Sequence, residues 1–261
     1  IISRHPEWKM DDRRLLNSID YKKGTIKIKG KEYPMRSCNF PTIDPKNPDK
    51  LTKEEEAIIE RLHQSFTSSE KLRGHIRSLL RHGCMYNIFN HNLLYHASIP
   101  LTKDGELKEV ELKPGLKLKG KELMYQTGML IRSAFQVPTD EEGEEERDYA
   151  IDYFLYLWCG PDSPLFDKDK MATFERYFLE DKSTWKEAKG AYYQLRDSAA
   201  ICDYIMDSFN VVGEHRHIIN GHVPVHVSNG ESPIKADGRL MVIDGGFAEA
   251  YHNTTGIAGY T

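Results

Sequence analysis

The sequence predicts a mixed α/β fold, in which α-helices and β-strands follow one another along a soluble globular chain. Of its 261 residues, 39% are hydrophobic and 29% are charged, which is enough apolar content for a core. Several segments repeat apolar residues at helical spacing, and short alternating runs end at Gly, Asn or Asp. These features exclude a disordered, collagen-like or membrane-spanning chain. The length allows one large domain or two small ones.

The first segments indicate a short helix followed by a hairpin. Asp11 or Asp12 can cap a helix that continues to Ile19. Residues 25–33 alternate apolar and polar side chains around a turn at Gly30, which predicts a β-hairpin.

Two helices are predicted next. Thr52 and Glu55 have the spacing of a capping box, in which the two residues satisfy each other's backbone N–H groups at a helix start. A second helix is expected to stop at Gly83. The apolar residues at helical spacing are Ile58, Ile59, Leu62 and Phe66 in the first helix, and Leu72, Ile76, Leu79 and Leu80 in the second.

The remainder of the chain alternates between helices and strands. Residues 140–147 are strongly acidic and are expected to form a solvated loop, and residues 161–184 are expected to form a long, ordered loop of the kind that often carries function. The other predictions are strands at 84–90, 93–101, 217–220 and 239–244, helices at 119–136, 147–159 and 198–209, and a final hairpin that includes 256–261.

Charge and cysteine content limit the function classes. The 36 Lys and Arg against 40 Asp and Glu leave a net charge of −4, so neither nucleic acid nor an anionic membrane is an expected partner. The four cysteines are far apart and form no Cys-x-x-Cys pair, which favours a reducing cytoplasm and argues against structural zinc. The chain starts without Met and stops within a predicted hairpin strand, so we expect a fragment of a longer polypeptide.

Two histidines stand where apolar strands run into turns. His96 follows Leu93-Leu94-Tyr95, and His222 follows Ile218-Ile219-Asn220-Gly221. Strand ends are where open α/β sheets place their sites, and imidazole suits Zn, Mn or Fe. For either histidine taken singly, a core residue satisfied by hydrogen bonds is the alternative. A third feature, the segment 230–246 ending in Asp244-Gly245-Gly246, also has the pattern of an ordinary hairpin.

Taken in order, four segments resemble the second half of the calcineurin-like metallophosphatases. They are the strand ending in His96, then 157–161 (Leu-Trp-Cys-Gly-Pro), 220–225 (Asn-Gly-His-Val-Pro-Val) and 242–246 (Val-Ile-Asp-Gly-Gly). More narrowly, residues 157–166, 168–171, 174–178, 220–225 and 230–238 resemble the class III fructose-1,6-bisphosphatases of bacteria. The resemblance covers essentially the whole chain and matches the C-terminal part of a longer family sequence.

The resemblance implies a fold, a metal and a set of site residues. The implied fold is the C-terminal half of a β-sandwich flanked by helices, with residues 1–82 as a helical and hairpin insert region and 83–261 as the metallophosphatase part. His96 and His222 are the implied ligands of one metal of a manganese pair. Ala97-Ser98 stands where Gly-Gly is common in the family, so the match is firmer at His222. Lys168, Lys170, Arg176 and Lys235 are the implied phosphate-binding cations, each of which could instead form a surface ion pair.

The chain also departs from the family pattern. It contains no Asp-x-His, Gly-Asp-x-x-Asp-Arg or Gly-Asn-His-Asp, the motifs that supply the remaining ligands and the catalytic histidine. Two neutral imidazoles hold a divalent ion weakly, so we expect no turnover without an N-terminal half, whether that half is a separate chain or part of the same one.

Three functions follow as hypotheses. The first is part of a fructose-1,6-bisphosphate 1-phosphatase of gluconeogenesis, in which metal-activated water attacks the C1 phosphate. The second is a metallophosphatase for nucleotides or phosphoproteins, and the third is a noncatalytic regulatory fragment. Self-association into a homo-oligomer stays open.

Overall fold

The computed structural model describes residues 1–246, 248–249, 253, 255–256 and 259. Its largest sheet has five strands in the order β4-β5-β8-β10-β9. The central strands β5 (Asn92–Tyr95), β8 (His217–Asn220) and β10 (Leu240–Val242) are parallel. The edge strands β4 (Tyr86–Phe89) and β9 (Ile234–Lys235) are antiparallel to their neighbours. The three carboxyl ends of the central strands therefore meet at one edge of the sheet.

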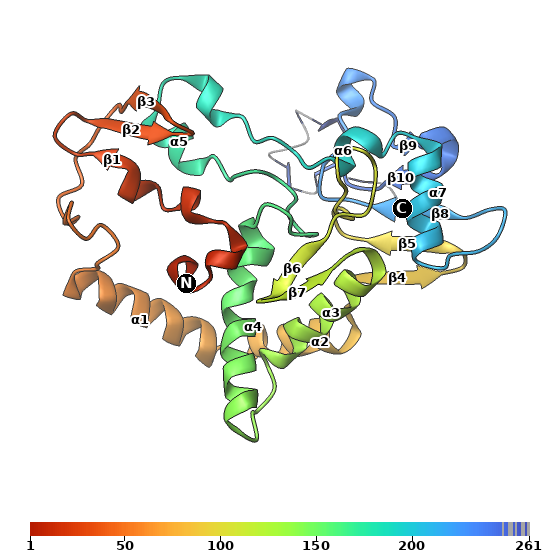
Figure 1. Ribbon diagram of the computed structural model, residues 1–261, viewed down its shortest axis with the longest axis horizontal. Helices are drawn as coiled ribbons and strands as arrows, with labels where there is room; N and C mark the ends of the chain where they lie inside the picture. Colours follow the sequence, from red (N-terminus) through yellow and green to blue (C-terminus); the bar gives the residue numbers. More distant parts are fainter. Residues whose placement is uncertain (247, 250–252, 254, 257–258, 260–261) are drawn as a thin grey trace.

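Two smaller antiparallel sheets complete the β-structure of the described residues. One consists of β1 (Ile19–Asp20), β2 (Thr25–Ile28) and β3 (Lys31–Pro34), and the other of β6 (Val110–Lys113) and β7 (Leu116–Leu118). The β1–β3 sheet and the five-stranded sheet lie toward opposite ends of the longest axis of the molecule (Figure 1).

The helices are α1 (Lys53–Ser68), α2 (Glu70–His82), α3 (Gly120–Ser133), α4 (Glu141–Cys159), α5 (Thr173–Phe178), α6 (Tyr192–Leu195) and α7 (Ala199–Ser208). Helix α7 packs against β8 and α3. The mixed α/β class predicted from the sequence is confirmed, and the strands of the five-stranded sheet lie between residues 86 and 242.

Three groups of buried side chains hold these elements together. The largest joins Leu93, Ile218 and Leu240 of the central strands to Ile205 of α7. A second packs α4 against β6, and the N-terminal Trp8 belongs to it. The third lies under the β1–β3 sheet, where Ile26 meets Leu179 from the segment after α5. N-terminal residues thus take part in two of the three cores.

Helices α1 and α2 form where predicted but contribute no buried residue. The Thr52 side chain accepts from Glu55 N at 3.2 Å, and the Glu55 carboxylate accepts from Thr52 N at 2.8 Å, so the predicted capping box is confirmed. Ile59 is 54% exposed and Phe66 is 64% exposed. Helical periodicity alone does not specify what an apolar face packs against.

Most of the predicted elements are confirmed, with shifted ends. The hairpin in 25–33 is β2–β3, and the tight turn between β4 and β5 consists of Asn90 and His91, both with positive φ. The strand predicted at 93–101 ends at Tyr95, and the strand predicted at 239–244 ends at Val242. The predicted return strand in 256–261 lies largely outside the described residues.

Three predictions are wrong. The loop expected at 161–184 contains the short helix α5, whose Phe174 packs against the third core. The acidic run 140–147 is the first part of α4, because the Asp140 side chain accepts from Gly143 N at 2.8 Å and three glutamates in the first turn complement the helix dipole. The expected helix after Asp12 is replaced by two 3-10 turns, Asp11–Arg13 and Leu15–Ser18, and no side chain caps either turn. Within the described residues, no helix is long and apolar enough to cross a membrane.

Candidate functional site at the carboxyl edge of the sheet

The candidate site lies where β5, β8 and β10 end. His96 directly follows β5, His222 follows β8 after Gly221, and Asp244 follows β10 after Ile243. Backbone hydrogen bonds tie these ends together: Gly221 N donates to His96 O at 2.9 Å, and Ile243 N donates to Asn220 O at 2.8 Å. The parallel pairing of the strands therefore brings residues more than a hundred positions apart into one place.

The two predicted histidines are neighbours. The ring centroids of His96 and His222 lie 5.0 Å apart, and the rings meet edge to face at 61°. His96 also borders a pocket of about 320 Å³, whose lining includes Asn220 and Gly221. The sequence predicted that these two histidine side chains would lie close together, and they do.

Asn220 fixes the loop after β5. Its side chain is 1% exposed, and its Nδ2 donates to Ala97 O at 2.9 Å and to the Tyr192 hydroxyl at 2.8 Å. The Tyr192 hydroxyl in turn lies 2.8 Å from the Tyr95 hydroxyl. This buried chain of hydrogen bonds holds the last residues of β5 and β8 in register beside His96.

The backbone at His222 is strained. Its φ is 66°, in the left-handed region that residues other than glycine avoid, and Val223 N donates to Gly221 O at 2.8 Å across it. This is a γ-turn with positive φ, an uncommon conformation. Such conformations cost roughly 1–3 kcal/mol and persist only where the surroundings impose them.

Among the residues that the structure describes, the buried Nε2 of His222 has no hydrogen-bond partner. A buried polar atom without a partner costs free energy, so native structures rarely leave one unless water or a ligand meets it. The backbone turn at His222 therefore fixes the position of the imidazole, and its Nε2 remains available to a ligand.

Both histidines are held in the neutral form. Burial lowers the pKa of His222 to about 4, and repulsion that a protonated His96 would exert and the charge of Lys168 add to this shift. Burial also lowers the pKa of His96, although the Asp244 carboxylate opposes this shift. A neutral imidazole carries the free nitrogen lone pair that a metal ion requires.

The four predicted phosphate-binding cations contact different groups. Lys168 lies near His222, since its charge contributes to the lowered pKa of that histidine, and its Nζ is 3.3 Å from Glu187 Oε2. Lys235 Nζ lies 2.9 Å from Glu231 Oε1 and 3.9 Å from Asp197 Oδ1.

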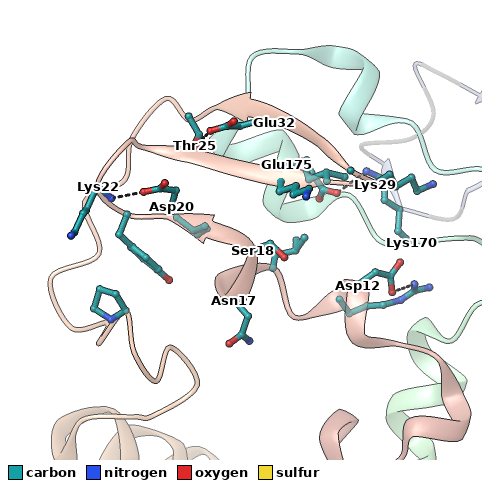
Figure 2. Close-up of a pocket in the computed structure, with 18 of the residues that line it drawn as sticks. Asp12, Asn17, Ser18, Asp20, Lys22, Thr25, Lys29, Glu32, Lys170 and Glu175 are labelled. Carbon is teal, nitrogen blue, oxygen red and sulfur yellow. Dashed lines mark hydrogen bonds and ion pairs between the residues drawn. The ribbon is translucent and has the colours of Figure 1, made fainter.

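Lys170 and Arg176 contact groups in α5 and in the segment that follows it. Lys170 Nζ lies 2.7 Å from Glu175 Oε1, and both side chains are largely buried. Arg176 is exposed and donates to Trp185 O at 3.3 Å. Figure 2 shows Lys170 and Glu175 beside Lys29 of the N-terminal hairpin, at the edge of a pocket of about 1080 Å³ lined mainly by residues 12–32.

No pattern in the sequence pointed to the segment 189–196 as part of a site. This segment places Lys189, Tyr193 and Arg196 close together: Arg196 Cζ lies 5.2 Å from the Tyr193 ring centroid, and Lys189 Nζ lies 5.7 Å from it. Two adjacent tyrosines flanked by a lysine and an arginine were the available signal, but nothing in the spacing linked them to His222.

Comparison with known proteins identifies relatives along the whole chain. A family model described as Firmicute fructose-1,6-bisphosphatase matches residues 1–261. Curated relatives named fructose-1,6-bisphosphatase class 3 are 58% identical in Phocaeicola vulgatus, 56% in Bacteroides fragilis and 54% in Bacteroides thetaiotaomicron. Each alignment covers 100% of this chain but 39% of the relative, so the chain spans about two fifths of the length of these proteins. No solved structure matches the chain.

Proposed function

Because this chain belongs to the Firmicute fructose-1,6-bisphosphatase family, we propose that it forms the histidine-bearing part of an enzyme that hydrolyses the C1 phosphate of fructose 1,6-bisphosphate. The chain spans 39% of its relatives, so the activity is proposed for this chain together with the remaining length of such a protein. The proposed setting is gluconeogenesis in the cytoplasm, for which the four free thiols Cys38, Cys84, Cys159 and Cys202 are support.

The observation that carries the proposal is the histidine pair. Two neutral imidazoles 5.0 Å apart, one of them with an unpartnered buried nitrogen, come from separate strands at the edge of a sheet. A buried ring nitrogen without a partner is unusual in a folded protein, so a ligand explains the pair better than packing does.

The residues fit part of a manganese site. Imidazole nitrogens are suitable ligands for Mn²⁺, and His96 and His222 would hold the ion from two directions. Among the described residues, no group of three His, Cys, Asp or Glu side chains could hold a metal, so other ligands have to come from beyond this part of the chain. When bound, a two-metal centre supplies an activated water and neutralises phosphoryl oxygens.

The chain's own cations have a separate role in this proposal. Lys168 lies close enough to His222 to influence its protonation, and its charge would favour an anionic substrate at the same edge of the sheet. Lys235 would add to the positive potential there, although Glu231 partly neutralises it.

A panel of phosphate esters tests the proposal. The full-length protein is assayed with Mn²⁺ on fructose 1,6-bisphosphate, nucleoside monophosphates and a phosphoserine peptide, and we expect the highest kcat/KM on the sugar bisphosphate. A preference for nucleotides or phosphopeptides would instead support a different metallophosphatase. Absence of turnover on every ester in the presence of Mn²⁺ would support a regulatory role.

A further inference from the structure

Four cations gather beside the histidine pair, and we call Lys168, Lys189, Arg196 and Lys235 the cationic cluster. Lys168 and Lys189 face each other in an isolated antiparallel bridge. Burial lowers the pKa of Lys189, and the charges of Arg196, Lys168 and Lys235 lower it further. The charge of Lys168 also reaches His222. Hydrogen bonds place the segment 189–196 in the same part of the molecule as the histidine loops, since Gly190 N donates to Asp167 O at 2.8 Å and Asn220 Nδ2 donates to the Tyr192 hydroxyl at 2.8 Å.

Arg196 is the buried member of the cluster. The residue is 6% exposed, and its guanidinium lies over the Tyr193 ring. No described residue offers a hydrogen-bond partner to its Nη1 or to the buried Tyr193 hydroxyl. Leaving such donors unsatisfied is costly, most of all for a charged group, so this arrangement is suited to an acceptor that the protein itself does not provide.

The charges of the cluster are only partly balanced. Glu187 pairs with Lys168, and Glu231 and Asp197 pair with Lys235. Within the described part of the chain, neither Lys189 nor Arg196 forms an ion pair. The Glu231 carboxylate acts on both charges without forming an ion pair with either. Two such positive charges beside a buried hydroxyl match a phosphate dianion in both charge and hydrogen-bonding capacity.

We propose that Lys189, Arg196 and the Tyr193 hydroxyl bind the phosphate of the substrate that is not hydrolysed. This assignment rests on the proposed function, and it replaces Lys170 and Arg176 in that role, because Lys170 is engaged by Glu175 and both residues belong to the α5 region. The planar guanidinium of Arg196 can donate two parallel hydrogen bonds to phosphate oxygens, and the ammonium of Lys189 adds a point charge.

The test compares two substrates that differ only in the remote phosphate. Fructose 1,6-bisphosphate and fructose 1-phosphate both carry the phosphate to be cleaved. In the full-length Mn²⁺ enzyme, we expect K189M to reduce the ratio of their kcat/KM values about tenfold, mainly through KM for the bisphosphate. R196K should reduce the ratio less than R196M, because it keeps the charge. K186M, at an exposed lysine three residues before Lys189, should leave both values unchanged.

An equal loss on both substrates in K189M would show a structural role and overturn the assignment, as would an unchanged ratio. Binding of inorganic phosphate to the metal-free protein, measured by calorimetry, gives a result that does not depend on turnover. We expect about tenfold weaker binding in K189M than in wild type, and equal binding would overturn the assignment even if the enzyme proved inactive on sugar phosphates. A wild-type protein that binds phosphate through Lys189 but does not hydrolyse fructose 1,6-bisphosphate would contradict the proposed function alone.

Discussion

At the scale of single residues, the site depends on a backbone conformation that local preferences oppose. His222 adopts a positive φ between Gly221 and Val223, and the hydrogen bonds that join the ends of β5, β8 and β10 keep it there. An imidazole fixed in this way is oriented before any ligand arrives, so little entropy remains to be lost on binding.

Asp167 is a second residue under constraint. It is 3% exposed, and a Cβ on Gly190 would lie 1.9 Å from its Oδ1, so only glycine fits at position 190. Burial raises the pKa of Asp167 to about 6, the Asp162 charge adds to the rise, and Ser98 opposes it.

This shift predicts a pH-dependent stability. Between about pH 4 and pH 6 the folded state keeps Asp167 protonated while the unfolded state ionises it, so its contribution is complete at low pH and is lost as the pH rises through 6. We expect D167N to gain up to about 3 kcal/mol in unfolding free energy relative to wild type across this window. Urea denaturation at several pH values measures the difference, and a constant difference would contradict the assignment.

At the scale of elements, α1 depends on its cap because little else stabilises it. None of its residues is buried, so the Thr52–Glu55 capping box is its main fixed interaction at the N-terminus. We expect T52A to destabilise the first turn by about 1 kcal/mol. Amide hydrogen exchange over residues 53–57 should speed up about fivefold, whereas T67A, at the far end of the same helix, should leave these amides unchanged. Equal exchange in T52A and wild type would show that the cap contributes nothing.

Local signals explain which elements the sequence predicts correctly. The capping box at Thr52, the stop at Gly83 and the alternation in 25–33 each act over a few residues, and each prediction agrees with the structure. The prediction of a loop at 140–147 was wrong because the charge of this run was interpreted as a sign of solvation. Asp140 and the glutamates after it instead cap and stabilise the start of α4.

At the scale of the whole molecule, the histidine pair could be predicted and the cationic cluster could not. His96 and His222 each follow an apolar strand, and a parallel sheet brings such positions together. Lys189 and Arg196 carry no comparable signal, because they approach Lys168 and Lys235 only through tertiary packing. Lys170 and Arg176 engage the Glu175 carboxylate and the Trp185 carbonyl, contacts that the sequence does not reveal either.

We propose that His96 and His222 together hold part of a manganese centre. Equilibrium binding of Mn²⁺ to the full-length protein, followed by the electron paramagnetic resonance signal of the free ion, tests it directly. We expect about two ions per wild-type chain and about one in H222A, with H217A, at an exposed histidine of β8, binding as wild type does. Two ions bound with wild-type affinity in H222A would contradict the claim.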